Sequence, residues 1–126
     1  MSDSRDNFTT FEKLEVFQRA YRISLVIHKA SKKFPKHEQF FFAKQLRDSS
    51  KSIGANIVEG VAKQFYSKRE FKRFLVIAIG SSDETRMWVR YAYDLGYITK
   101  ETWQDWSNEY RAISKMLHGL YKAQNK

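Results

Sequence analysis

The apolar residues in the last quarter of the chain recur with the spacing of an α-helix. Between residues 100 and 123 they are separated by alternating steps of three and four, which places them on one face of a helix. The members of this stripe are Trp103, Trp106, Tyr110, Ile113, Leu117 and Leu120. Such a stripe is typical of the core-facing seam of a helical bundle, so we expect a packed helix here.

A second helical segment, over residues 68–95, carries more apolar residues than one helix face can hold. Its core stripe consists of Phe71, Phe74, Ala78, Thr85, Trp88, Ala92 and Leu95. Val76, Ile77 and Ile79 extend the apolar surface around the rest of the predicted helix. A helix that is apolar on all sides has to be buried on all sides. These three residues therefore cover joints within one subunit or contact another copy of the chain, and we favour self-association.

Proline, glycine and capping residues divide the chain into four predicted helices, at about residues 13–33, 38–64, 68–95 and 100–123. Phe34-Pro35 ends the first helix, because proline disfavours helical geometry in the residue before it. Gly96 is suited to the left-handed conformation that follows a helix end. The candidate N-caps of the first, third and fourth helices are Thr9 or Thr10, Ser67 and Thr99. This order predicts one all-α domain over residues 1–126.

Composition narrows the class of protein. A chain of 126 residues that is 42% hydrophobic and 16% aromatic can build one packed core. It has no cysteine, which excludes disulfides and thiolate metal sites, and its first residues lack the pattern of a secretory signal. The longest apolar run, residues 74–79, is far shorter than the roughly 20 residues that cross a bilayer. We expect a cytoplasmic protein without a membrane partner.

The net charge of +9 is concentrated in one part of the chain. Residues 19–73 contain 14 basic and 4 acidic side chains, whereas the rest is close to neutral. Such a field favours an anionic partner, although a solvated surface that keeps the protein in solution explains the same numbers. The candidate nucleic-acid-binding residues form two clusters, the first being Lys29, Lys32, Lys33 and Lys36, and the second Lys63, Lys68, Arg69, Lys72 and Arg73.

Catalytic and metal-binding patterns are missing from the sequence. A di-metal site in a helical bundle uses Glu-x-x-His pairs, and no Glu here is followed by His at that spacing. The three histidines, His28, His37 and His118, have no spacing that brings two together. The serines lie inside predicted helices, and no glycine-rich phosphate loop is present. The sequence therefore predicts a protein that is not an enzyme and has no metal or cofactor.

Several segments, in one order along residues 11–120, resemble a known family. They are FEKLEVFQRAYRIS, FPKHEQF, QLRDSSKSIGANIVEG, KREFKRFLVIAIGSSDE and DLGYIT. Together they resemble the bacterial four-helix-bundle proteins encoded in intervening sequences of large-subunit (23S) ribosomal RNA, to which an accessory subunit of diversity-generating retroelements is related. The resemblance implies an up-and-down antiparallel bundle that assembles as a ring-like homo-oligomer, a homopentamer. Asn56, Glu59 and Glu84 match the family's motif positions, and we expect them to form a polar network that fixes helix register or a subunit contact.

Two functions fit these observations. The first is electrostatic binding of RNA or DNA with low sequence specificity by a basic surface that is repeated around a ring. Phe65 and Tyr66, between the second and third helices, could stack on an unpaired base or could cover the core. The second is a protein-interaction scaffold that docks an acidic or RNA-bound partner, such as the reverse transcriptase that the retroelement subunit accompanies. In a simple bundle the two basic clusters lie at opposite ends.

Overall fold

A computed structural model describes residues 10–125, and these residues fold into four α-helices with no strand among them. The helices are α1 (Glu15–Ser31), α2 (Phe42–Gln64), α3 (Lys68–Asp94) and α4 (Lys100–Ala123). Short 3-10 helices, Phe11–Lys13 and Lys36–Glu38, precede α1 and α2. The all-α, four-helix prediction is confirmed.

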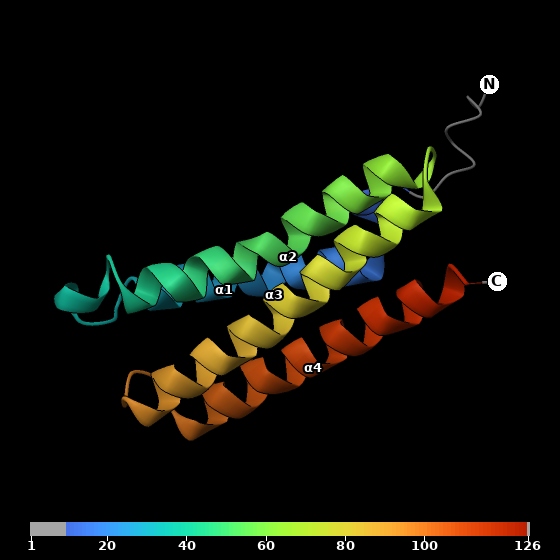
Figure 1. Ribbon diagram of the computed structural model, residues 1–126. Coiled ribbons are helices and arrows are strands. Elements are labelled where there is room, and N and C mark those ends of the chain that lie inside the picture. The colour runs from blue at the N-terminus through green and yellow to red at the C-terminus, as the bar shows by residue number, and fades with distance from the viewer. Residues whose placement is uncertain (1–9, 126) are drawn as a thin grey trace.

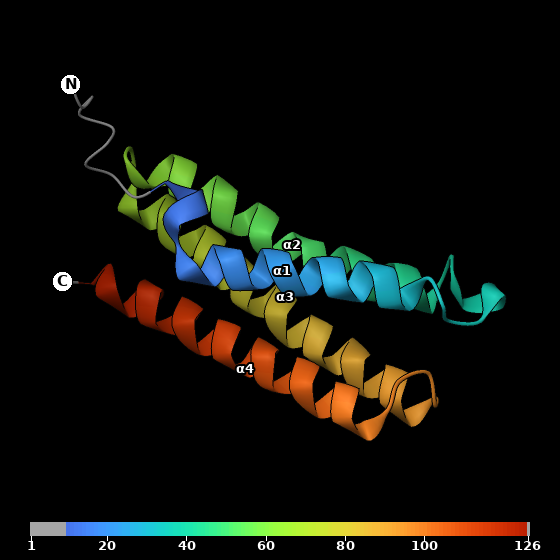
Figure 2. The ribbon, with the colours of Figure 1, turned by 180° about the vertical axis from the view of Figure 1, so that it is seen from behind.

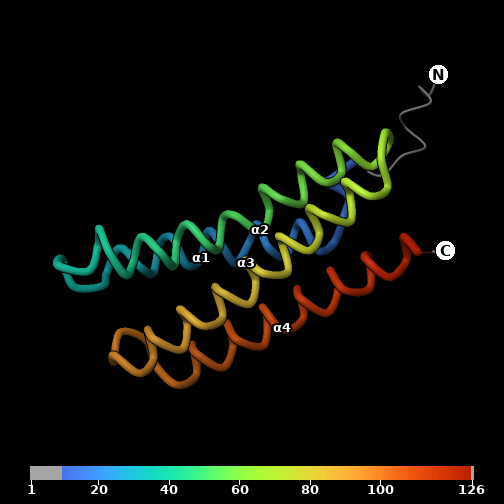
Figure 3. Tube along the Cα trace, in the orientation of Figure 1, coloured from blue at the N-terminus to red at the C-terminus, as the bar shows by residue number. Residues whose placement is uncertain are grey.

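The four helices run alternately up and down along one rod (Figures 1 and 2). The joint between α1 and α2 lies at the same end as the joint between α3 and α4, as the trace in Figure 3 shows. The α2–α3 joint lies at the other end, where α1 begins and α4 ends. In space, α3 lies between α2 and α4 and packs against both, while α1 packs against α2 and α4. The first turn of α3 therefore lies near the last turn of α4.

The core runs along the axis of the rod and uses most positions of the predicted stripes, but Leu95, predicted to face the core, is 50% exposed, and Leu75 and Val89, which were not predicted, are fully buried. In α4, Trp106, Tyr110, Ile113 and Leu117 are buried, and the two ends of the stripe, Trp103 and Leu120, are half-buried. The side chains that face them from the other helices include Ile27, Leu46, Ile53, Ile57, Phe71 and Leu75. Among residues 10–125, no helix has both the length and the apolar character needed to cross a bilayer.

The predicted ends of α3 and α4 agree with the structure to within one residue. The Ser67 hydroxyl accepts a hydrogen bond from the Glu70 amide at 3.1 Å, and the Thr99 hydroxyl accepts one from the Thr102 amide at 3.1 Å. Gly96 adopts φ 81°, a left-handed conformation that side chains with a Cβ rarely take. The positions of these helix ends depend on residues at the ends themselves, so they can be predicted from the sequence.

The predicted starts of the first two helices are wrong. α1 begins at Glu15, its N-cap is Leu14, and Thr10 makes no capping bond; Thr9 lies outside the described residues. α2 begins four residues later than expected. Its predicted first turn is occupied by the end of the 3-10 helix and by Gln39, whose side-chain amide donates to the carbonyl oxygens of Ser31, the last residue of α1, and of Phe34.

Candidate nucleic-acid interface

The α2–α3 joint is held by a close approach of the two helices. Gly60 of α2 is buried against α3, and a Cβ at this position would lie 3.1 Å from the Cβ of Phe74 and 3.2 Å from the ring of Phe71. The turn that follows exposes Phe65 and Tyr66, with 62% and 84% of their surfaces open to solvent. These two aromatic side chains are exposed and do not cover the core, so the second of their two predicted roles is wrong.

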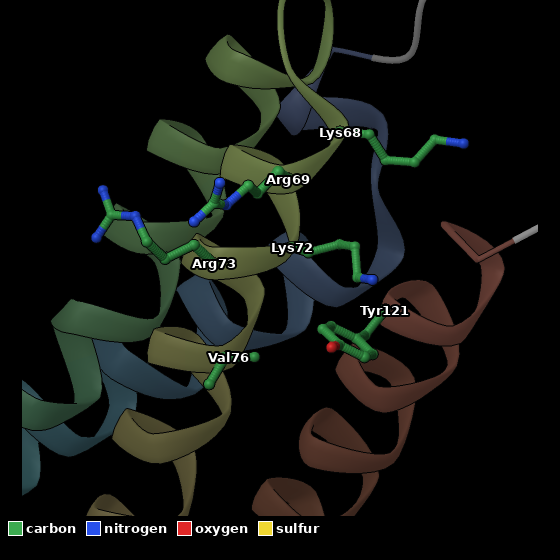
Figure 4. A pocket seen from close by; sticks show the side chains of 6 residues that line it. All are labelled: Lys68, Arg69, Lys72, Arg73, Val76 and Tyr121. Carbon is green, nitrogen blue, oxygen red and sulfur yellow. The ribbon is translucent and has the colours of Figure 1, made fainter.

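A basic pocket of about 420 Å³ lies beside this joint (Figure 4). It is lined by Lys68, Arg69, Lys72, Arg73 and Val76 of α3 and by Tyr121 of α4. We call this set the joint pocket. Four of the five predicted residues of the second cluster thus gather in one place, and Lys63 lies at the end of α2 in the same joint.

Lys72 connects the first turns of α3 to the end of α4. Its Nζ lies 4.8 Å from the centroid of the Tyr121 ring and donates a hydrogen bond of 2.7 Å to the side-chain oxygen of Asn125. Figure 4 shows Lys72 extended toward Tyr121, whereas Arg73 points to the other side of α3. The sequence analysis did not assign Tyr121 or Asn125 to this site. The signal that could have found Tyr121 and Asn125 is the antiparallel order of α3 and α4, which places the start of α3 beside the end of α4.

Glu70 is the carboxylate that pairs with Arg73 in the joint. Glu70 accepts hydrogen bonds from Arg73 at 3.1 and 3.3 Å, and the Arg73 guanidinium also lies 4.5 Å from the Phe74 ring centroid. The hydrogen bond from Arg73 lowers the pKa of Glu70 below its usual value, and nearby Lys63 and Arg69 act in the same direction. Among residues 10–125, Arg69 makes no hydrogen bond or ion pair. Lys63, Arg69 and Lys72 therefore keep positive charges that no ion pair neutralises within residues 10–125.

Helix stability does not explain where these cations lie. The N-terminal end of a helix carries a partial positive charge, so lysine and arginine in the first turn are unfavourable there. Lys68 and Arg69 occupy the first two positions of α3. The exposed backbone amides and the side-chain cations add their fields at this end, which favours an anion from solution.

The lysines of the first cluster lie elsewhere. Lys29, Lys32, Lys33 and Lys36 are all exposed at the end of α1 and in the following turn, at the end of the rod opposite the joint pocket. The two clusters are therefore separate surfaces on one protomer.

The predicted polar network does not form within one protomer. Asn56 donates to the carbonyl oxygen of Ser52 at 2.8 Å and to its hydroxyl at 3.0 Å, and the Ser52 hydroxyl is 2.9 Å from that of Ser81 on α3. Glu59 is exposed, and Glu84 is exposed and accepts a hydrogen bond from Trp88 at 3.0 Å. Within residues 10–125 no hydrogen bond joins Asn56, Glu59 and Glu84, because both carboxylates stay hydrated on the surface.

Apolar side chains remain exposed on two helices of the protomer. On α3, Val76 is 52% and Ile77 is 39% exposed, and on α1, Tyr21 is 53% and Leu25 is 43% exposed. Val76 and Ile77 do not cover the joints of their own chain. Ile79, by contrast, is half-buried and packs on the core. Of the three residues predicted to extend the apolar surface around this helix, Val76 and Ile77 are exposed and Ile79 is not.

The described residues provide little for metal or acid–base chemistry. No group of three His, Asp or Glu side chains within residues 10–125 is arranged to hold a metal ion. The ring nitrogen Nδ1 of His28 lies 3.0 Å from Nζ of Lys51, and this ammonium group is the main reason that the pKa of His28 is lowered.

Comparisons with known proteins agree with the fold. The family model described as "23S rRNA-intervening sequence protein" matches residues 12–119. A solved structure from Bacteroides thetaiotaomicron, titled as a protein of unknown function from the S23 ribosomal protein family, is 30% identical. The match covers 85% of this chain and 95% of that chain, with a TM-score of 0.76. Comparison with curated proteins finds no match.

Proposed function

Since this chain belongs to the 23S rRNA-intervening sequence protein family, we propose that it is a non-enzymatic, oligomeric bundle that binds nucleic acid through the joint pocket. Binding is electrostatic and has low sequence specificity. The observation that carries the proposal is the gathering of Lys68, Arg69, Lys72 and Arg73 in one pocket, with Lys63 at the same joint. Arginine and lysine hold phosphates by charge-assisted hydrogen bonds. A cytoplasmic location follows from the proposed ligand.

The exposed aromatic residues of the joint support nucleic acid over other polyanions. Phe65 and Tyr66 lie next to the cations in the chain and are 5.5 Å apart between ring centroids. An unpaired base stacks on such rings, and stacking tolerates every base, which suits a surface without a base-reading motif. A single strand, or the unpaired part of a folded RNA, is therefore the proposed ligand class.

Assembly is the second part of the proposal. The exposed apolar residues of α1 and α3 lie on the flanks of the rod, where a neighbouring copy would cover them. A closed ring, which we propose to be a homopentamer as the family resemblance implies, repeats the joint pocket around one rim. Several modest phosphate contacts then act on one strand, which raises the overall affinity.

A charge-reversal variant tests the proposal. In R69E/K72E/R73E, three cations of the joint pocket become anions, and we expect the mobility shift of a labelled single-stranded RNA to disappear even at about 50 mM salt, where electrostatic contacts are strongest. The matched control is K29E/K32E/K33E, which changes the net charge equally at the other end of the rod. Circular dichroism and light scattering establish that helicity and assembly are unchanged. Equal loss in both variants, or loss only in the control, contradicts the assignment to the joint pocket.

The alternative function is a scaffold that docks an acidic or RNA-bound protein partner. The same exposed cations favour it, because carboxylates and phosphates are recognised by the same side chains. A protein that binds no RNA or DNA at about 50 mM salt supports the scaffold and removes the proposal of direct binding.

A further inference from the structure

A second basic groove lies between α3 and α4, away from the joint pocket. It has a volume of about 440 Å³, and its charged and polar lining is Asp83, Arg86 and Arg90 of α3 with Ser107 and Arg111 of α4. We call it the arginine groove. None of its residues belongs to the two basic clusters predicted from the sequence. Its lining carries three guanidinium groups and one carboxylate.

The arginines of this groove are poorly neutralised. Arg86 is half-buried and makes no hydrogen bond or ion pair within residues 10–125. Arg111 donates to the neutral side-chain oxygen of Asn108 at 2.9 Å, and only Arg90 has an acid, Asp94, at 3.0 Å. The carboxylate within the groove, Asp83, accepts from the Ser114 hydroxyl at 3.0 Å and pairs with none of the three.

The groove wall is also preorganised. Trp103 is stacked on Tyr93 with ring centroids 4.8 Å apart and an interplanar angle of 6°, and the Arg90 guanidinium lies 4.9 Å from the Trp103 centroid. Stacking fixes the plane of the guanidinium and leaves donors for an oxyanion. Ser107, which lines the groove as well, keeps a buried hydroxyl without a hydrogen-bond partner among the described residues.

The joint pocket and the arginine groove open along the same seam between two helices. On α3, Lys72, Val76, Asp83, Arg86 and Arg90 share one face at roughly 100° per residue. On α4, Tyr121 of the first site and Arg111, Ser107 and Trp103 of the second share the facing side. Figures 1 and 3 show the two helices close together near their shared joint and diverging toward the end where α3 begins and α4 ends. From Lys72 to Arg90 the seam is about 27 Å long, at 1.5 Å per residue.

We infer that one nucleic-acid strand lies along the α3–α4 seam, with its phosphates held by the joint pocket at one end and by the arginine groove at the other. This inference rests on the proposed function and extends the site across the protomer. At the duplex rise of about 3.4 Å per nucleotide the seam corresponds to about eight nucleotides, and an unstacked single strand, which advances further per nucleotide, spans it with fewer.

The test compares RNA lengths in fluorescence anisotropy. Labelled single-stranded RNAs of about 3 and about 16 nucleotides are titrated, because only the longer one reaches both sites. We expect R86Q/R90Q/R111Q to weaken binding of the longer RNA and to flatten the slope of log affinity against log salt by about 1.4 to 2, which corresponds to two or three lost phosphate contacts. R22Q/K44Q/K51Q removes the same charge from α1 and α2 and serves as the control. The single variant R86Q flattens the slope by about 0.7 without removing a contact that the fold uses.

The outcomes separate this inference from the proposed function. Wild-type protein that binds neither RNA contradicts both. The inference alone is overturned by a combination of two results. The wild type binds RNA and R69E/K72E/R73E does not, while R86Q/R90Q/R111Q binds the longer RNA as its control does. A changed mass of R86Q/R90Q/R111Q in light scattering also overturns it, since the groove would then contact a second copy of the chain.

Discussion

The same substitution, glycine to alanine, should have opposite effects on the stability of the protein at Gly60 and at Gly80. Alanine inside a helix is favoured over glycine by roughly 0.5–1 kcal/mol, and an added Cβ at Gly80 meets no atom within 4 Å. Gly80→Ala should therefore stabilise the protein by about that amount. At Gly60 the new Cβ would meet the Cβ of Phe74 at 3.1 Å, and this atom is fixed to the α3 backbone. Overpacking of this kind costs about 1–3 kcal/mol, so Gly60→Ala should destabilise by about 0–2 kcal/mol.

The measurement is urea unfolding of the wild type and both variants at one protein concentration, followed by circular dichroism. We expect the two variants to lie on opposite sides of the wild type, about 1–3 kcal/mol apart, with equal denaturant slopes. Gly119→Ala, another helical site where a Cβ meets nothing within 4 Å, should behave like Gly80→Ala. Equal stabilisation at Gly60 and Gly80 would refute the close α2–α3 approach that holds the joint pocket.

Three further predictions concern charge and assembly. The pKa of His28 is lowered, chiefly by Lys51, so the imidazole binds a proton more readily in the unfolded chain than in the folded protein. The free energy of unfolding should therefore decrease as the pH drops through about 6.5. Thermal unfolding at several pH values should show a smaller decrease for His28→Gln than for the wild type. Arg19 of α1 donates two hydrogen bonds to Glu109 of α4, and a double-mutant cycle with glutamine at both positions should give a coupling of about 1 kcal/mol, whereas zero coupling contradicts a structural role. Ile77→Glu should lower the mass in light scattering toward the 15.0 kDa protomer, and an unchanged oligomer excludes this face from the contact.

The sequence predicted α3 and α4 well because their limits depend on neighbouring residues. Ser67, Thr99 and Gly96 act on their own backbone, and the apolar stripe of α4 repeats without interruption. The joint between α1 and α2 could not be predicted in this way. Its geometry depends on side chains that reach distant backbone, such as Arg47, which donates to the Gln39 carbonyl at 2.8 Å.

The site was predictable to the extent that it follows the linear charge pattern. The tract at residues 63–73 is visible in the sequence, and the structure brings most of it into one pocket. The contribution of α4 depends on antiparallel packing, which pairs Lys72 with Tyr121 across 49 positions of sequence. The arginine groove was missed for the same reason, because its arginines come from separate helices and form no run. The polar network was wrong within one protomer, because motif position does not show whether a carboxylate is buried, and its role in a subunit contact stays a prediction.

The most direct test of the central claim is the salt dependence of RNA binding by the wild-type protein. Affinity for a labelled single-stranded RNA is measured by anisotropy between about 50 and about 200 mM salt. Three phosphate contacts in the joint pocket predict a slope of log affinity against log salt of about −2, and contacts from further protomers or from the arginine groove make it steeper. Absence of binding at the lowest salt, or an affinity that does not change with salt, would contradict the account.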